Sequence, residues 1–350
     1  MNKFCNNSDI IEIVERLGNK KDLFSGKRIL LTGGTGFLGR YFVEVFDLIA
    51  QNLVEKLELV ILDNLVSGCD LSHKFCDYDH LKFVNHNVIQ PFDDGKKYDY
   101  IIHAAGIASP FYYKKMPLQT LDVAITGTRN MLDLALKNNA KFSFFSSSEI
   151  YGDPDPREIP IKENYRGNVA CQGPRACYDE SKRVGETLAD IYHNYKKLHT
   201  NTIRPFNIYG PGMQENDYRV LPNFARSIKK GLPLKVYGSG RQTRTFCYIT
   251  DAIIGFLLVV LNGKSGEAYN IGNSEPEISI LDLAKEIKSV VGESVKYEIV
   301  DYPNSYPGDE PTRRLPDLNK AKEHLDYEPK ISLNEGLVRF LNWSNLNYID

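Results

Sequence analysis

Short apolar runs alternate with segments of helical periodicity over residues 27–205. The runs read RILLT, LELVILD, LKFVNHN, YDYIIHAA, KFSFFSS and HTNTIRP. Such alternation is typical of parallel strands joined by right-handed helical crossovers, with helices on both faces of the sheet. The pattern therefore predicts an α/β fold with a doubly wound parallel sheet of the Rossmann type, formed by residues 27–205.

The regions on either side have different patterns. Residues 1–26 contain IIEIVERL, which predicts a short amphipathic helix packed on the outside of the sheet domain or on a partner chain. After Pro205 the chain is richer in Gly, Pro and Tyr, interrupted by the helical stretches LPNFARSIKKG and SILDLAKEIKSVVG. We expect residues 206–350 to form a smaller α/β lobe that holds the second substrate at the mouth of the sheet, with the chain crossing back to the Rossmann domain.

Composition and charge exclude several classes of partner. The formal net charge of −2 over 350 residues leaves no basic surface for general nucleic-acid binding. The longest apolar run, 252–261, is too short to span a bilayer, and the N-terminus lacks the apolar core of a signal peptide. Cysteines at positions 5, 69, 76, 171, 177 and 247 show no spacing typical of a metal site or a disulfide framework. We expect a cytoplasmic protein without metal, nucleic acid or membrane.

A glycine-rich turn follows the first strand-like run. In ILLTGGTGFLGR, at 29–40, Gly33 permits a tight turn, Gly36 leaves room for a pyrophosphate, and Gly39 lets the following helix pack closely on the strand. About thirty residues after Gly33, the second run ends at Asp63, whose carboxylate can accept hydrogen bonds from an adenosine ribose. An anion there repels a 2′-phosphate, so the pattern favours NAD over NADP.

Candidate catalytic residues lie at the start of a predicted helix and at the end of a strand. The Y-x-x-x-K pattern occurs twice, but Tyr178 with Lys182 follows a turn and opens its helix, whereas Tyr192 lies further along it. The Lys182 ammonium, one helical turn away, is expected to lower the pKa of the Tyr178 phenol and to hold the cofactor ribose. A phenolate at Tyr178 could act as general base for a sugar hydroxyl, and Ser147, near the end of a strand, can hydrogen-bond that hydroxyl. Glu149 lies two residues further on, so strand alternation points its side chain to the same side as Ser147.

The sequence resembles the extended short-chain dehydrogenases/reductases of the NAD-dependent epimerase/dehydratase family, which act on nucleotide sugars. Within that family it is most similar to the UDP-glucuronate decarboxylases. The similarity covers about residues 27–340 and is carried by SSSEIYGDP (146–154), GPRACYDESKRVGET (173–187), RPFNIYGPGM (204–213), VYGSGRQTRTF (236–246) and DEPTRRLPDL (309–318).

This resemblance implies oxidation of the sugar at C4 by bound NAD, loss of C6 as carbon dioxide, and return of the hydride, giving UDP-xylose or the 4-keto pentose. Tyr178 is then the base, and Glu149 positions the sugar or handles the proton at C5. The catalytic residues implied are Tyr178, Lys182, Ser147, Glu149, Ser148 and Arg244. The cofactor residues are Gly33, Gly36, Phe37, Leu38, Gly39, Asp63, Asn64, Asn87, Val88, Ala104, Ala105, Tyr178 and Lys182, and the substrate residues are Asn207, Arg219, Tyr237, Gly238, Arg244 and Arg314. Family members commonly form homodimers through the helix near 118–138 and the Tyr178 helix.

The sequence differs from the decarboxylase pattern at several positions. Gly106 and Ile107 replace a usual Ser-Pro pair, Ala124 replaces an Asn, and Tyr218 replaces a Gly. Three alternatives therefore stay open. A 4,6-dehydratase usually has an acid where this chain has Ser148, a 4-epimerase has no evident task for Glu149, and an NAD-binding regulator would not need the catalytic set.

Overall fold

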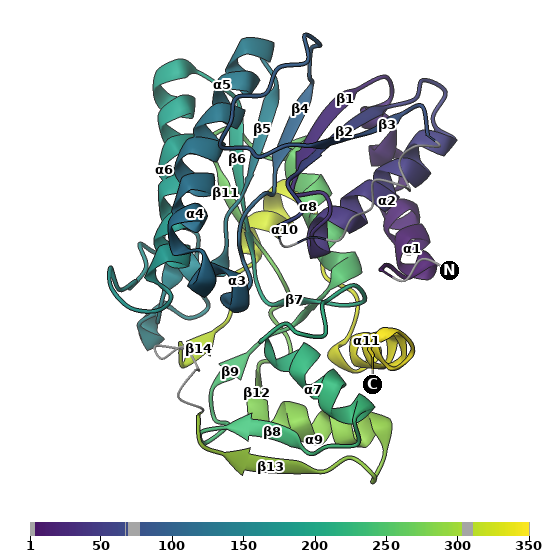
Figure 1. Ribbon diagram of the computed structural model, residues 1–350, viewed down its shortest axis with the longest axis vertical. Helices are drawn as coiled ribbons and strands as arrows, with labels where there is room; N and C mark the ends of the chain where they lie inside the picture. Colours follow the sequence, from purple (N-terminus) through teal and green to yellow (C-terminus); the bar gives the residue numbers. More distant parts are fainter. Residues whose placement is uncertain (1–3, 67, 69–77, 303–310, 350) are drawn as a thin grey trace.

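The computed structural model describes residues 4–66, 68, 78–302 and 311–349. Cys69, Cys76 and the first two residues of the segment 309–318 lie outside the described residues. The chain folds around a parallel seven-stranded sheet in the order β11-β6-β5-β4-β1-β2-β3 (Figure 1). Its strands are β1 (Arg28–Thr32), β2 (Glu58–Asp63), β3 (Leu81–Asn85), β4 (Tyr100–His103), β5 (Lys141–Phe145), β6 (Thr200–Pro205) and β11 (Ala268–Ile271).

The predicted doubly wound parallel sheet is confirmed. Strand order reverses between β1 and β4, which pair in parallel with Ile29 opposite Tyr100, so a crevice forms beyond their carboxyl ends. Six of the seven strands come from the predicted runs. The seventh, β11, lies in the sequence after Pro205 and pairs in parallel with β6. The chain therefore returns to the sheet after entering the smaller lobe.

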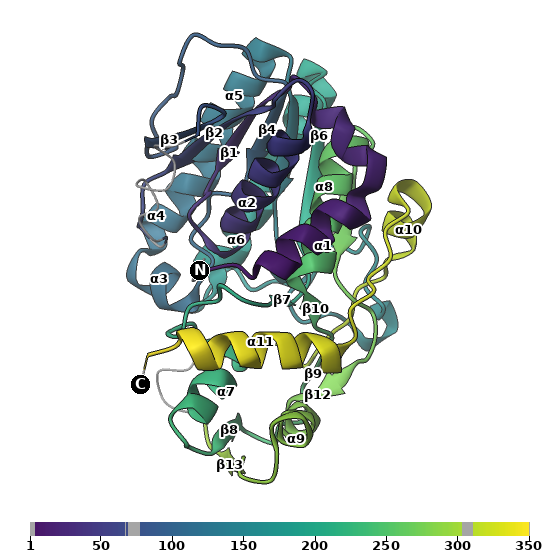
Figure 2. The same ribbon diagram turned by 90° about the vertical axis from the view of Figure 1, so that its right-hand side faces the viewer.

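Helices cover both faces of the sheet. One face packs against α5 (Thr128–Asn138) and α6 (Ala176–Lys196), whose buried Met131, Leu132 and Leu188 contact the sheet core. The other face packs against α2 (Phe37–Asn52) and α8 (Ile249–Asn262), with α1 (Asn7–Leu17) outside them (Figure 2). The apolar run 252–261 lies in α8, where every residue of the run is buried. No helix among the described residues is long and apolar enough to cross a membrane.

An interrupted helix precedes β5 in the sequence and lies on the same face of the sheet as α6. It runs through α4 (Pro117–Asp122), a π-helical turn η3 (Val123–Gly127) and α5. The short helix α3 (Pro110–Lys115) comes before it and lies at the lower edge of the sheet domain (Figure 1). The other short helices among the described residues of the sheet domain are η1 (Gly18–Phe24), η4 (Ser148–Tyr151) and η5 (Pro156–Glu158).

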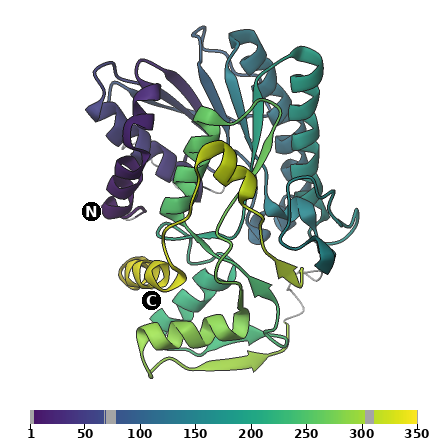
Figure 3. The same ribbon diagram turned by 180° about the vertical axis from the view of Figure 1, so that it is seen from behind.

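The smaller lobe lies beyond the carboxyl ends of the strands (Figure 3). Its strands are β7 (Ile208–Tyr209), β8 (Leu234–Tyr237), β9 (Thr243–Arg244), β10 (Cys247–Tyr248), β12 (Ile278–Ser279), β13 (Tyr297–Val300) and β14 (Arg313–Arg314). Its helices are α7 (Val220–Lys229), α9 (Ile280–Val291) and α11 (Leu333–Asn347), while α10 (Asn319–Leu325) lies back beside the sheet domain. Serine hydroxyls at 279 and 332 cap α9 and α11 by accepting backbone N–H bonds.

Candidate active site

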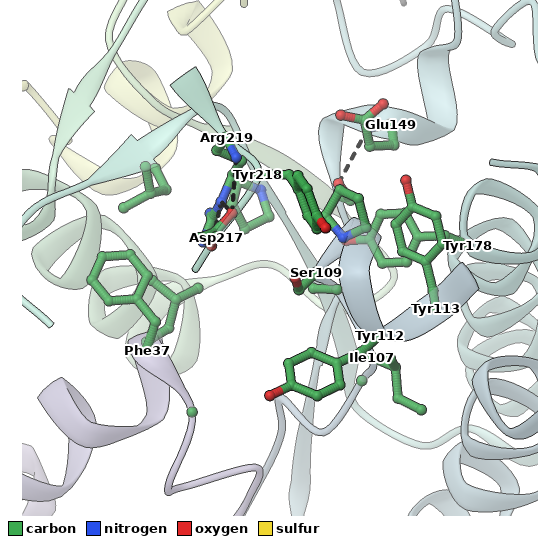
Figure 4. A pocket seen from close by; sticks show the side chains of 18 of the residues that line it. Phe37, Ile107, Ser109, Tyr112, Tyr113, Glu149, Tyr178, Asp217, Tyr218 and Arg219 are labelled. Carbon is green, nitrogen blue, oxygen red and sulfur yellow. Dashed lines mark hydrogen bonds and ion pairs between the residues drawn. The ribbon is translucent and has the colours of Figure 1, made fainter. Parts of the chain in front are cut away.

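A cavity of about 540 Å³ lies between the carboxyl ends of the central strands and the smaller lobe. Its walls include residues that follow β1, β2, β4 and β5 and residues from the loop before α7 (Figure 4). All the predicted site residues line it except Gly238: Gly33, Gly36, Phe37, Leu38, Gly39, Asp63, Asn64, Asn87, Val88, Ala104, Ala105, Ser147, Ser148, Glu149, Tyr178, Lys182, Asn207, Arg219, Tyr237, Arg244 and Arg314.

The glycine turn has the geometry of a dinucleotide cradle. Gly33 has φ of +76°, and a Cβ there would lie 2.8 Å from the Ala105 nitrogen. A Cβ at Gly39 would lie 2.1 Å from the Gly33 oxygen, so the helix could not approach the turn with any larger residue. At Gly36 a Cβ would meet only the Gly33 oxygen, at 3.4 Å. A side chain at Gly36 would therefore fit sterically, but it would occupy cavity space at the N-terminus of α2, where an anion binds well.

Asp63 fixes the backbone beside this cradle. Its Oδ2 accepts the N–H of Thr35 at 3.0 Å, and its Oδ1 accepts the N–H of Leu65 at 2.8 Å. Asn64 and Asn87 likewise use their amide oxygens for backbone N–H groups two residues on, each at 3.3 Å. The glycine turn and a carboxylate at the end of the second strand fit the diphosphate and ribose of NAD.

Tyr178 and Lys182 lie on the first turns of α6, facing the cavity, and both are buried. Lys182 Nζ donates to the Phe145 oxygen at 2.8 Å and lies 5.9 Å from the centre of the Tyr178 ring. Tyr113 from α3 stacks on Tyr178, with ring centres 5.4 Å apart and planes at 12° (Figure 4). Ser147 hydrogen-bonds the phenol. The stack and this bond hold the phenol at the cavity wall.

The charges around Tyr178 differ from the sequence-based expectation. Burial raises the pKa of Tyr178 to about 12, although the bond from Ser147 acts in the opposite direction. Burial also lowers the pKa of the Lys182 ammonium to about 8, against the favourable charge of Glu186. The protein groups alone therefore keep the phenol protonated at neutral pH. Deprotonation of Tyr178 needs a further positive charge or a proton acceptor in the site.

Glu149 lies at the centre of an arginine cluster. One carboxylate oxygen pairs with Arg314 from β14 and the other with Arg175, which precedes α6. Arg244 lies opposite Arg314 in the register of β9 and β14. Burial favours a higher pKa for Glu149, but Arg314, Arg175 and Arg244 lower it to about 2. Glu149 is therefore ionised at neutral pH, which fits positioning better than carrying a proton.

Sequence reasoning missed Arg175 and Tyr113 as members of this site. Arg175 lies within the string GPRACYDESKR, the segment most typical of the decarboxylases, and this was the only signal for it. Tyr113 is one of three aromatic residues after a strand and carried no distinguishing motif.

Asp179, next to Tyr178, is also buried, and burial together with the Glu149 charge raises its pKa to about 7.

The predicted substrate residues in the smaller lobe differ in their contacts and in whether they line the cavity. Arg219 Nε donates to Asp217 Oδ2 at 2.9 Å at the cavity wall. Asn207 has φ of +44°, and its Nδ2 donates to the Thr245 oxygen at 2.9 Å. Tyr237 stacks on Tyr302, with ring centres 5.8 Å apart. Gly238 lies outside the cavity wall, and a Cβ there would meet the Tyr302 ring at 2.6 Å.

Three of the positions that differ from the decarboxylase pattern gather around Lys182. Gly106, Ile107 and Ala124 line a separate small cavity of about 10 Å³ together with Lys182. A Cβ at Gly106 would lie 3.0 Å from Lys182 Nζ. These differences therefore lie on the proton-transfer side of the site and leave the Glu149 cluster unchanged. Among the described residues, no group of three or more His, Cys, Asp or Glu could hold a metal ion.

Comparison with known proteins agrees with this geometry. The profile of the NAD dependent epimerase/dehydratase family matches residues 29–272. The chain belongs to this family. It is therefore an enzyme of the NAD-dependent epimerase/dehydratase type, and its cofactor is NAD. The profile covers the glycine turn, Ser147, Tyr178 and Lys182.

Relatives within the family point to one subgroup. UDP-glucuronic acid decarboxylase 1 of Arabidopsis thaliana is 41% identical over 317 residues, covering 90% of this chain and 69% of that protein. UDP-glucuronic acid decarboxylase 6 of the same plant is 40% identical over 322 residues, covering 92% of this chain and 90% of that protein. UDP-glucuronic acid decarboxylase 1 of Xenopus tropicalis is 38% identical, covering 91% and 72%.

Solved structures share the fold. Epimerase Mth375 of Methanothermobacter thermautotrophicus has a TM-score of 0.79 at 26% identity, covering 97% of this chain and 96% of that one. DesIV, a dTDP-glucose 4,6-dehydratase of Streptomyces venezuelae solved with NAD and TYD, has a TM-score of 0.78 at 24% identity, covering 91% and 97%. The similarity to DesIV supports the two-lobed Rossmann architecture and says nothing of substrate.

Proposed function

We propose that this enzyme decarboxylates UDP-glucuronate after oxidising it at C4, giving UDP-xylose or the 4-keto pentose. One observation carries the proposal: the Tyr178 phenol shares its cavity with an arginine cluster whose field lowers the pKa of Glu149 to about 2. The same field, from Arg175, Arg244 and Arg314, favours the C6 carboxylate of a sugar acid beside Glu149. Relatives named as UDP-glucuronic acid decarboxylases, 38–41% identical, add independent support.

The chemistry can be assigned to groups in the cavity. The positive charge of bound NAD would favour the Tyr178 phenolate, which then accepts the proton of the C4 hydroxyl. Ser147 holds that oxygen, and Lys182 binds the cofactor ribose. NAD, when bound, supplies the acceptor for the C4 hydride and afterwards its donor. The C4 ketone then lies β to the carboxylate. The C5–C6 bond breaks, its electron pair enters the C4 carbonyl as an enolate, and carbon dioxide leaves.

The balance of the reaction requires one proton from solvent. Tyr178 takes a proton from O4 and returns it to O4 at the final reduction, so it contributes none to C5. Carbon dioxide leaves from a carboxylate, and C5 must then gain a proton that the substrate did not bring. Glu149 stays ionised at neutral pH, which supports a role in orienting the sugar acid and leaves a water as the proton donor.

Loss of water from C6, as in a 4,6-dehydratase, is the second candidate. It needs an acid for the leaving hydroxyl, and this chain has the buried Ser148 at the position where many dehydratases have an aspartic acid. A serine hydroxyl does not protonate a leaving group at neutral pH. The field of the arginine cluster also favours a carboxylate over the neutral C6 hydroxyl of UDP-glucose.

Mass spectrometry of product nucleotides tests the proposal. Purified enzyme with NAD is incubated with UDP-glucuronate, and in parallel with UDP-glucose, dTDP-glucose and GDP-mannose. We expect UDP-glucuronate alone to lose one carbon dioxide, and Tyr178→Phe to abolish that loss. If UDP-glucuronate is unchanged and another sugar nucleotide loses water, the enzyme is a dehydratase; a C4 epimer with unchanged mass would make it an epimerase.

We further propose that two copies of the chain associate through α4, η3, α5 and α6 in the cytoplasm. Support comes from large apolar side chains exposed on these elements: Leu118 is 71% exposed and Tyr195 83% exposed, with Ile125 and Ile191 also exposed. Such a surface costs free energy in water and gains it when a second copy covers it.

Light scattering at micromolar concentration tests the dimer. Leu118→Asp should give monomers. Val54→Asp is the matched control, because Val54 is also an exposed apolar residue but lies after α2, away from this surface. A monomeric unmodified chain would contradict the dimer.

A further inference from the structure

An aromatic pair joins the sheet domain to the smaller lobe beside the cavity. Phe111 comes from α3 in the sheet domain, and Tyr218 from the loop before α7 in the smaller lobe. Their rings stack with centres 5.9 Å apart and planes at 27°. Lys115 Nζ lies 3.7 Å from the centre of the Phe111 ring on the same helix. We call Phe111 and Tyr218 the bridge.

One ring of the bridge belongs to the wall of the cavity that contains Tyr178. Tyr218 lines the cavity, and so do Ser109 and Tyr112 on either side of Phe111. In Figure 4, Tyr218 lies between the Asp217–Arg219 pair and the stacked rings of Tyr113 and Tyr178. Tyr218 lines the cavity and is also more than half exposed, so its ring lies at the rim, between solvent and the groups around Tyr178.

Burial does not account for the position of the Tyr218 ring. Tyr218 is 54% exposed, so its side chain adds little to the core. The backbone beside it is fixed independently, because the buried Asp217 accepts the N–H and the Nε of Arg219, both at 3.0 Å. The ring of Tyr218 can therefore leave Phe111 without disturbing the fold, which suits a contact that opens and closes.

We propose that the bridge determines the product of the reaction by holding the 4-keto pentose until it is reduced. The proposal rests on the proposed decarboxylation. After carbon dioxide has left, the keto sugar is neutral at its sugar end and no longer has the carboxylate that the arginine cluster attracts. A physical barrier at the mouth then keeps it beside Tyr178. When the hydride returns to C4, the released product is the pentose.

Loss of the bridge should change the amounts of keto pentose and NADH that are formed. If the keto sugar leaves before reduction, its C4 stays a ketone, and the hydride removed from C4 stays behind as one NADH per keto sugar released. Proton balance also shifts, because the O4 proton taken by Tyr178 goes to solvent. The ratio of keto pentose to pentose therefore measures how well the bridge retains the intermediate.

The test compares Tyr218→Ala and Phe111→Ala with the conservative Tyr218→Phe. Keto pentose is trapped with methoxylamine and counted by mass spectrometry, and enzyme-bound NADH is followed by absorbance. We expect the unmodified enzyme and Tyr218→Phe to release mainly pentose, and both alanine variants to raise the keto fraction and the NADH several-fold. Tyr297→Ala is the control, because Tyr297 is also a partly exposed aromatic residue but lies on β13, outside the cavity wall.

A second readout does not depend on turnover. The dissociation rate of UDP-xylose from the NAD-loaded enzyme, measured by surface plasmon resonance, should rise several-fold in both alanine variants and stay unchanged in Tyr218→Phe. Unchanged product ratios in both alanine variants would overturn the proposal, as would keto pentose as the main product of the unmodified enzyme. No carbon dioxide from the unmodified enzyme would instead refute the decarboxylation itself.

Discussion

The cofactor half of the cavity is held by backbone hydrogen bonds, whereas the substrate half is held by ion pairs between side chains. In the cofactor half, the Gly33 N–H donates to the Leu62 oxygen at 2.8 Å, and Asp63 binds two backbone N–H groups nearby. In the substrate half, Glu149 joins Arg175 to Arg314, which come from segments far apart in the sequence. A backbone cradle depends on few side chains and suits a cofactor shared across a family. Substitutions can change the charge of a side-chain cluster, and with it the substrate that the enzyme accepts.

Tyr178 stands where the two halves meet, and its loss should have the largest effect. Tyr178→Phe keeps the stack on Tyr113 but removes the group that accepts the C4 proton, so kcat should fall by at least about 10²- to 10⁴-fold. NADH binding, followed by fluorescence titration, should be unchanged. Substantial remaining turnover would show that another group is the base.

Arg314→Met should weaken the use of UDP-glucuronate without affecting cofactor binding. It leaves the Glu149 carboxylate with only one of its two ion pairs, and kcat/KM for UDP-glucuronate should fall roughly 10²-fold or more, because removing one partner of a buried charge pair costs about 2–5 kcal/mol. Arg313→Met is the matched control, since Arg313 is adjacent on β14 but is exposed and pairs with Glu277 outside the cavity. Equal losses in the two variants would argue against the arginine cluster as the acid-binding site.

Asp63→Asn should weaken NAD binding without affecting the binding of the sugar nucleotide. Asn has one acceptor oxygen, so one of the two backbone N–H groups held by Asp63 loses its partner, and a charge that attracts the ribose hydroxyls is gone. We expect the Kd of NAD to rise about tenfold, with KM for the sugar unchanged and binding of NADP improved. A change in sugar KM larger than the change in NAD affinity would show that the halves are coupled.

The pH dependence of cofactor binding should be the mildest effect. Burial lowers the pKa of Lys182 to about 8, so the ammonium is present below that pH and is lost as pH rises through it. NADH affinity should therefore weaken above about pH 8. Lys182→Arg keeps its charge and should remove this loss. Titrations from pH 6 to 10 that show no break near 8 would contradict the assignment.

The cofactor half was predictable from sequence because its parts are local. The glycine turn and the strand-end Asp63 each follow from a few adjacent residues, and parallel strands bring their carboxyl ends to one edge. The strand β11 was missed, since AYNI mixes polar and apolar residues over only four positions. Its pairing with β6 depends on contacts that only the fold provides.

The arginine cluster was only partly predictable. Arg314 and Glu149 are separated by 165 residues and Arg175 and Glu149 by 26, and no local pattern indicates which cation meets the carboxylate. The pKa of Tyr178 was also misjudged. Helical spacing correctly placed Lys182 near the phenol, but burial raises the pKa of Tyr178 and lowers that of Lys182, and desolvation cannot be read from spacing.

The most direct test follows the C4 hydrogen through one turnover. The enzyme, loaded with unlabelled NAD, is given UDP-glucuronate carrying deuterium at C4, and the pentose product is examined by mass spectrometry and NMR. The account predicts a UDP-pentose that has lost one carbon dioxide and keeps the deuterium at C4. A parallel reaction of unlabelled UDP-glucuronate in deuterium oxide should place one deuterium at C5. A product that has lost carbon dioxide while its C4 deuterium has exchanged with solvent, or no loss of carbon dioxide at all, would contradict it.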